Sequence, residues 1–185
     1  GGSLRFFSPL RDSALPSDAA GLYLPGGYPE LYAEALSRND AMRRVVRQAV
    51  ENGLPTVAEC GGFLYLGQSL EDEKGRAFPM AGVLPGQGIR TPRLVRFGYG
   101  ELTARADNLL LQAGETLPVH EFHYWDGTPN GGAFPVRKPL TGRSWECGFA
   151  SDTLYAAFPH LYFAGRPELA ERFVAAAGAY WDRRI

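Results

Sequence analysis

Short apolar runs alternate with a helical stripe along the first part of the chain. Residues 4–7, 21–24 and 54–58 are almost wholly apolar, which is typical of buried strands. Between the last two runs, residues 41–51 place apolar side chains near a helical repeat, with arginines on the other side. The stripe consists of Ala41, Met42, Val45, Ala49 and Val50. The pattern predicts strands separated by a covering helix.

The expected helix ends carry suitable residues. Asn39 or Asp40 fits the N-cap of the 41–51 helix, and Gly53 fits the left-handed position after it. Pro29 suits the first turn of a shorter helix that runs to about residue 36. A further helix is predicted over residues 61–70, directly after the third apolar run.

The rest of the chain predicts more strands and one closing helix. Strands are expected at residues 80–84, 94–104, 116–124, 145–150 and 153–158. A helix beginning near Pro167 has one apolar stripe, made of Leu169, Phe173, Ala176 and Tyr180. Strands alternating with helices are typical of a parallel sheet covered by helices. The predicted fold class is therefore α/β, in one domain over residues 1–185.

The composition is that of an ordinary globular domain. Of 185 residues, 45% are hydrophobic and 21% are charged, and the formal net charge is −1. This charge disfavours nucleic acid as a partner, because phosphates favour a basic face. No apolar run approaches the ~20 residues of a membrane-spanning helix. We therefore expect a cytoplasmic protein with neither nucleic acid nor membrane as a partner.

Cys60 stands where a predicted strand turns into a predicted helix. Gly61 and Gly62 follow it and allow a sharp turn of the backbone. This is the arrangement of a nucleophile elbow, which projects a reactive side chain at the carboxyl edge of the sheet. The N–H of Gly61 would point toward an oxyanion formed on an attacked carbonyl. The alternative is a buried, inert cysteine, which is how we interpret Cys147 in its strand with aromatic neighbours.

A second glycine-rich turn follows the strand at residues 21–24. The carboxyl ends of parallel strands face one crevice, so Gly26 or Gly27 could supply a second oxyanion N–H. Taken alone, Pro25-Gly26-Gly27 is an ordinary turn.

Three histidines are candidates for the base that a cysteine nucleophile needs. His120 and His123 lie three apart on a predicted strand and face opposite sides, so we predict no metal site there. His160 follows an apolar strand and precedes the last helix, which places it near the same sheet edge. We favour His160 as the base; the alternative is a structural histidine.

Four motifs occur in the order seen in one known family. They are Leu24-Pro25-Gly26-Gly27-Tyr28-Pro29-Glu30, Glu59-Cys60-Gly61-Gly62, His120-Glu121-Phe122-His123-Tyr124 and His160-Leu161-Tyr162-Phe163. Over nearly its whole length the chain resembles the C-terminal glutaminase domain of cobyrinic acid a,c-diamide synthases, a cobalamin-pathway branch of the class I glutamine amidotransferases. The resemblance implies a flavodoxin-like three-layer sandwich with a mostly parallel sheet, Cys60 as the nucleophile and His160 as its partner.

The resemblance also implies a reaction. Glutamine is hydrolysed, and its ammonia amidates the a and c carboxylates of a corrin in an ATP-binding synthetase domain. The chain has no Gly-x-x-x-x-Gly-Lys-Ser/Thr loop, so ATP and Mg²⁺ are expected in a synthetase domain outside it and no cofactor within it. The family's domain usually begins with a strand and helix upstream of Gly1, so a truncated N-terminus is expected.

The expected partners follow from the same resemblance. They are glutamine, the N-terminal synthetase domain and, through that domain, a corrinoid; a homodimer is also compatible with the sequence. Rival functions are a sister amidotransferase of the cobyric acid or nickel-sirohydrochlorin a,c-diamide type, a cysteine hydrolase on the same fold, and a non-enzymatic docking domain.

One departure from the family leaves the catalytic arrangement open. The family commonly has His-x-His after the last strand, and many class I amidotransferases have an acidic residue two past the histidine. This chain has Tyr162 at that position. Either a different group orients His160, or Cys60 and His160 act as an unassisted pair.

Overall fold

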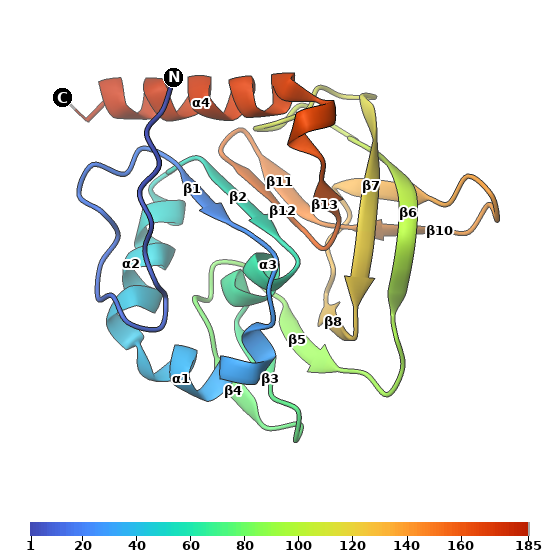
Figure 1. Cartoon of the computed structure of the whole chain (residues 1–185), viewed down its shortest axis with the longest axis horizontal. Helices are drawn as coiled ribbons and strands as arrows, with labels where there is room; N and C mark the ends of the chain where they lie inside the picture. The colour runs from blue at the N-terminus through green and yellow to red at the C-terminus, as the bar shows by residue number, and fades with distance from the viewer. Residues whose placement is uncertain (185) are drawn as a thin grey trace.

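The computed structural model describes residues 1–184, which form three β-sheets and the helices that cover them (Figure 1). The helices are η1 (Pro29–Tyr32), α1 (Ala33–Arg38), α2 (Asp40–Glu51), α3 (Gly61–Leu66), η2 (Phe163–Gly165) and α4 (Pro167–Asp182), where η denotes a 3₁₀ turn. The strands are β1 (Leu22–Leu24), β2 (Thr56–Glu59), β3 (Ser69–Glu71), β4 (Ala77–Pro79), β5 (Gln87–Arg90), β6 (Arg96–Thr103), β7 (Thr116–His123), β8 (Trp125–Thr128), β9 (Phe134–Arg137), β10 (Ser144–Cys147), β11 (Phe149–Ser151), β12 (Leu154–Ala157) and β13 (His160–Leu161).

The sheet that carries the candidate site has the strand order β1-β2-β12-β11. β2 pairs in parallel with β1 on one side and with β12 on the other, and β11 is antiparallel to β12. Because side chains alternate along a strand, each face of this sheet carries its own core. Ala58 belongs to the cluster that contains α1, α2 and α3, whereas Val57 packs in the cluster that contains α4. This layering confirms the predicted α/β class.

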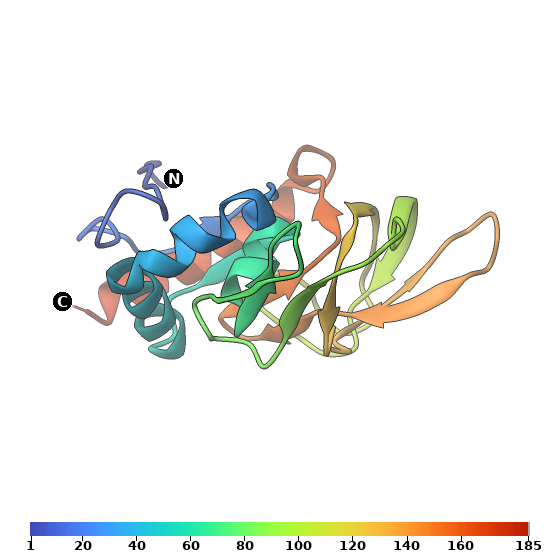
Figure 2. The ribbon, with the colours of Figure 1, turned by 90° about the horizontal axis from the view of Figure 1, so that it is seen from below.

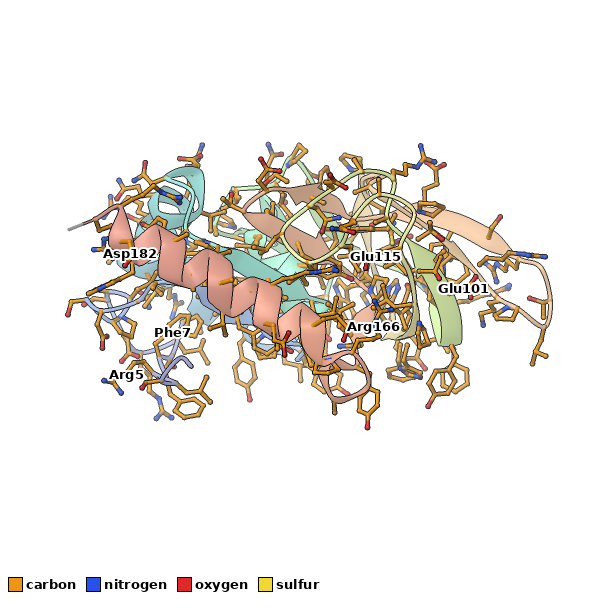
Figure 3. All side chains as sticks on the ribbon, turned by 90° about the horizontal axis from the view of Figure 1, so that it is seen from above. Arg5, Phe7, Glu101, Glu115, Arg166 and Asp182 are labelled. Atoms are coloured by element: carbon orange, nitrogen blue, oxygen red, sulfur yellow. The ribbon has the colours of Figure 1, made fainter. Side chains whose placement is uncertain are left out.

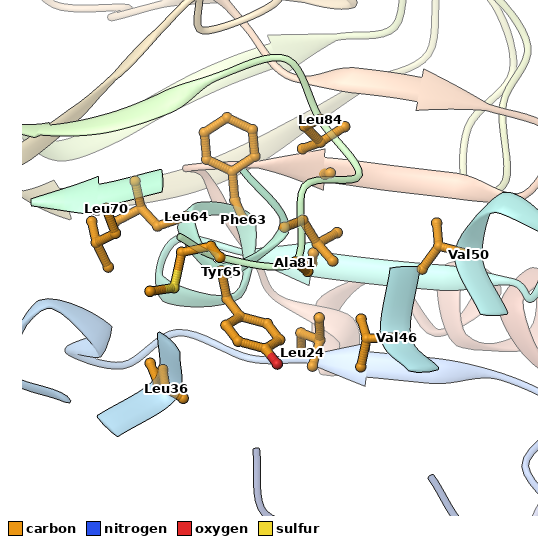
Figure 4. Close-up of a cluster of buried hydrophobic side chains, with 14 of the residues drawn as sticks. Leu24, Leu36, Val46, Val50, Phe63, Leu64, Tyr65, Leu70, Ala81 and Leu84 are labelled. Atoms are coloured by element: carbon orange, nitrogen blue, oxygen red, sulfur yellow. The ribbon is translucent and has the colours of Figure 1, made fainter. Parts of the chain in front are cut away.

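The first core cluster lies between this sheet and helices α1 to α3 (Figure 4). On α2 the fully buried stripe is Met42, Val46 and Val50, which lie one helical turn apart. The predicted stripe had Val45 in place of Val46, and Val45 is only half-buried. Each fully buried side chain of this kind contributes about 1.5–3 kcal/mol. Asn39 caps the helix as expected, accepting a hydrogen bond from the Met42 N–H at 3.3 Å.

The second core cluster lies on the opposite face, beneath α4. Leu169 of α4 is wholly buried there. Arg172 ties the helix to the loop before β7: its guanidinium donates to the Glu115 carboxylate at 2.5 and 3.0 Å. That hydrogen bond is the main cause that lowers the pKa of Glu115 to about 2. Figure 3 shows Arg166 at the start of α4 near Glu115, with Asp182 at the far end of the helix.

The other two sheets are not parallel. The five-stranded sheet, in the order β10-β9-β6-β7-β13, is antiparallel throughout. The four-stranded sheet β4-β3-β5-β8 is mixed. Seen from below, the long strands β6 and β7 lie toward one end of the molecule and α2 toward the other (Figure 2). The prediction of a mostly parallel sheet is therefore met only by the sheet that contains β1, β2 and β12.

Two predicted strands are wrong. Residues 4–7 form no strand and pair with none, and Leu4 and Phe6 are 83% and 92% exposed. Residues 80–84 are buried or half-buried but run as a loop, because their N–H groups bond to the end of α3: Ala81 donates to Tyr65 O at 3.0 Å and Val83 to Leu66 O at 2.9 Å. An apolar run by itself therefore determines neither burial, as residues 4–7 show, nor a partner strand, as residues 80–84 show.

Two predicted boundaries also move. The helix expected over residues 61–70 ends at Leu66, since Gly67 donates back to Leu64 O and β3 begins at Ser69. The strand expected over residues 145–150 divides into β10 and β11 at Gly148, whose φ of 78° is left-handed. Within residues 1–184 we find no helix suited to spanning a bilayer.

Candidate functional site

Cys60 occupies a strained turn between β2 and α3. Its φ of 46° and ψ of −101° are unusual for a residue that is not glycine. Two backbone bonds hold it there: its N–H donates to Ala157 O at 2.9 Å, and its C=O accepts from the Leu64 N–H at 3.0 Å. The predicted strand-to-helix turn is thus present, with β12 supporting it.

The glycines around Cys60 allow two turns to pack together. A Cβ on Gly62 would lie 2.2 Å from Leu24 O, and one on Gly61 would lie 2.8 Å from Gly27 N. Neither position has room for a side chain. The Gly62 N–H donates to Pro25 O at 3.1 Å, so the turn after β1 lies directly against the turn after β2.

His160 lies beside both turns. β13 pairs with β7, where His120 is its register partner. A Cβ on Gly26 would lie 2.5 Å from His160 Cε1, so the imidazole rests against the bare Gly26 backbone. Hydrogen bonding with Cys60, followed by hydrogen bonding with Glu59, raises the pKa of His160 to about 10. The structure therefore brings Cys60, His160 and Gly26 together.

Cys60 and His160 differ in their exposure to solvent. Cys60 is 8% exposed, whereas the His160 side chain is 34% exposed. Chemically, a thiol beside an imidazole can form a thiolate and attack an electrophilic carbon.

The predicted oxyanion donors, Gly26, Gly27 and Gly61, lie in the turns after β1 and β2. None of the turn and loop hydrogen bonds within residues 1–184 is donated by the N–H of Gly26, Gly27 or Gly61. These amides come from two turns that pack on each other beside Cys60, and they are the donors that an oxyanion would need.

Glu59 is the site residue that the sequence reasoning missed. Its carboxylate is 4% exposed and accepts from His160 Nδ1 at 3.4 Å, from Tyr23 Oη at 3.3 Å and from the Leu161 N–H at 3.2 Å. The signal in the sequence was an acidic residue at the end of an otherwise apolar strand. A buried carboxylate needs partners, and here they come from β1 and β13.

Of the remaining candidates, His120 faces His160 across the β7–β13 pair, whereas His123 and Cys147 make their polar contacts elsewhere. His123 is 6% exposed, bonded to Glu121 at 3.0 Å and to Trp125 O at 2.7 Å, and stacked on Phe158. Cys147 is buried, as predicted, and burial raises the pKa of its thiol. No group of three or more His, Cys, Asp or Glu residues suited to a metal occurs within residues 1–184.

A cysteine at a strained strand-to-helix turn, with an imidazole beside it on an α/β scaffold, defines the class of α/β proteins with a nucleophile elbow. The family is more specific. Residues 1–168 match the sequence model of the CobB/CobQ-like glutamine amidotransferase domain, and the chain belongs to that family.

Curated relatives agree with this family. The chain is 43% identical over 175 residues to the cobyrinate a,c-diamide synthase of Salmonella typhimurium and 40% identical over 170 residues to that of Caldanaerobacter subterraneus. These matches cover 92% and 91% of this chain but 38% of each relative. The protein of the same name from Dehalococcoides mccartyi is 35% identical over 187 residues, which is 98% of this chain and 40% of the relative. The chain thus spans about two fifths of the length of these relatives.

Proposed function

We propose that this chain is a glutaminase domain in which Cys60 releases ammonia from glutamine. The observation that carries the proposal is the placement of His160 and two glycine turns around Cys60, in a chain of the amidotransferase family. A flavodoxin-like sandwich centred on β1, β2 and β12 is the corresponding fold.

The first half of the reaction forms a covalent intermediate. The Cys60 sulfur bonds to the side-chain amide carbon of glutamine, and the carbonyl electron pair moves to oxygen. The N–H of Gly61 and that of Gly26 or Gly27 bind this oxyanion; elsewhere one such donor contributes about 3–4 kcal/mol. The C–N bond then breaks, and the His160 imidazolium gives its proton to the departing ammonia.

The second half regenerates the enzyme. His160, now neutral, takes a proton from water as that water attacks the glutamyl thioester. The C–S bond breaks, glutamate leaves and Cys60 returns to its thiolate, beside the protonated His160.

The ammonia serves an ATP-dependent amidation carried out by another part of a longer enzyme. The substrate we propose is cobyrinic acid, amidated at its a and c carboxylates, because the relatives named above are cobyrinate a,c-diamide synthases. ATP and Mg²⁺ bind in a synthetase domain that partners this one, and this domain itself uses no cofactor.

Measuring glutamate released from glutamine tests the proposal. Cys60→Ser removes the nucleophile with little change in volume and lowers kcat to background, whereas the matched control Cys147→Ser retains turnover. Substantial glutamate release by a folded Cys60→Ser variant would contradict the proposal.

A further inference from the structure

A carboxylate that the sequence did not predict lies behind the imidazole. Glu59 directly precedes Cys60, and alternation along β2 places its side chain on the α4 face of the sheet, beside Val57. Three donors converge on it, from Tyr23, His160 and Leu161. Each of its two oxygens accepts at least one of these hydrogen bonds, although the side chain is only 4% exposed. Such burial of an acid is costly unless its partners are fixed.

The contact fixes which ring nitrogen of His160 holds a proton. An ionised carboxylate can only accept, so the Nδ1 atom facing Glu59 must carry the hydrogen. The other nitrogen, Nε2, is then left for the sulfur of Cys60 and for the proton that moves during catalysis. Glu59 and Cys60 are neighbours in sequence, and both interact with the His160 imidazole, which comes from a distant part of the chain.

We propose that Glu59 is the positioning residue of this site, holding the His160 ring with its Nδ1–H toward the carboxylate and supporting the imidazolium that faces Cys60. This inference rests on the glutaminase function proposed above. It assigns the orienting group to β2, one residue before the nucleophile, and not to the position two past the histidine, where Tyr162 is 69% exposed.

Other charged or titratable groups around Glu59 and His160 are compatible with this role. Tyr23 donates to Glu59, and burial followed by the Glu59 charge raises the pKa of Tyr23, which keeps the phenol a donor. Burial and nearby charges, including Glu59, raise the pKa of Tyr155 on the neighbouring strand. His120 lies opposite His160 on β7. Besides Glu59, the buried carboxyl group in this region is Glu121 of β7. Glu121 is already hydrogen-bonded to His123 and Trp145.

Nitrogen-15 NMR titration of His160 in the folded chain tests the inference directly. Glu59→Gln keeps the size of the side chain but removes its charge, so the titration midpoint falls by about 1–3 pH units. The rate at which 6-diazo-5-oxo-norleucine labels Cys60 at neutral pH falls at least about tenfold. Glu59→Asp keeps the charge and retains part of the wild-type titration midpoint and labelling rate. Glu101→Gln, on the exposed face of β6, changes neither the midpoint nor the rate.

The outcomes separate this inference from the glutaminase proposal. Unchanged His160 titration and Cys60 labelling in folded Glu59→Gln would overturn the positioning role. If Glu59→Gln does not fold, the wild-type spectrum above the titration midpoint decides: a neutral ring with its proton on Nδ1 supports the role, and one with its proton on Nε2 overturns it. If Cys60 of the wild type is never labelled but the titration midpoint of His160 still depends on Glu59, the glutaminase proposal is contradicted and the positioning role of Glu59 is not.

Discussion

At the scale of single residues, Cys60 and His160 lie side by side because a strained turn carries the sulfur and the bare Gly26 backbone leaves room for the ring. The sequence predicts this proximity, because a cysteine between a strand and two glycines is a rare local pattern and its base must come from elsewhere in the chain. Glu59 was missed since its role depends on a side-chain direction and on a partner 101 positions away. Tyr162 stands two residues past His160, where many class I amidotransferases have an acidic residue, and its side chain is largely exposed.

Two adjacent glycines offer a matched test of how tightly His160 is held. A Cβ at Gly26 would lie 2.5 Å from His160 Cε1, whereas one at Gly27 meets nothing within 4 Å. Gly26→Ala must displace the imidazole and lowers kcat for glutamine hydrolysis about 100-fold, since misplacement by about 1 Å has that effect elsewhere. Gly27→Ala keeps its N–H and stays within a few-fold of the wild type. Equal kcat values for the two variants would contradict the packing of His160 on Gly26.

The raised pKa of His160 gives stability a defined pH dependence. The folded value of about 10 exceeds the unfolded value of 6.5, so between them the native state binds more protons and is stabilised. The free energy of unfolding of the wild type, minus that of His160→Asn, should be largest below about pH 6.5 and shrink as the pH rises toward 10. Urea unfolding at several pH values measures this difference. A difference that grows with pH would show that the imidazole is held neutral.

At the scale of helices and strands, the periodicity of apolar residues predicted the elements that depend mainly on local sequence. It gave α2 with its Asn39 cap, the strands β1, β2 and β12, and α4 beginning at Pro167. It failed where tertiary contacts decide. Residues 80–84 satisfy their N–H groups on the end of α3, and the two-residue β13 exists only because it pairs with β7.

The junction between β1 and α3 depends on one glycine. A Cβ at Gly62 would lie 2.2 Å from Leu24 O and 2.7 Å from Leu24 C, which are backbone atoms that cannot rotate away. Gly62→Ala should therefore lower the free energy of unfolding by about 1–3 kcal/mol, as overpacking does in other cores. Chemical denaturation measures the loss, with Gly178→Ala on α4 as the control, because its Cβ meets nothing within 4 Å. A neutral Gly62→Ala would mean that the two turns separate more easily than described.

At the scale of the whole molecule, three strands from distant parts of the sequence build one site. β1 supplies the Gly26–Gly27 turn, β2 supplies Glu59 and Cys60, and the segment after β12 supplies His160. The α/β class followed from the alternation of strands and helices, but the antiparallel sheet of β6, β7, β9, β10 and β13 did not. Its pairings join segments separated by glycine- and proline-rich loops, and the periodicity within one strand does not say which other strand it pairs with.

The central claim is that the Cys60 sulfur attacks the side-chain carbon of glutamine with the help of His160. Mass-spectrometric mapping after incubation with 6-diazo-5-oxo-norleucine, which resembles glutamine and alkylates the attacking thiol, tests it most directly. We predict one covalent adduct on the peptide that contains Cys60, none on Cys147, and a much slower reaction in His160→Ala. An unmodified Cys60, or equal labelling of Cys60 and Cys147, would contradict the account.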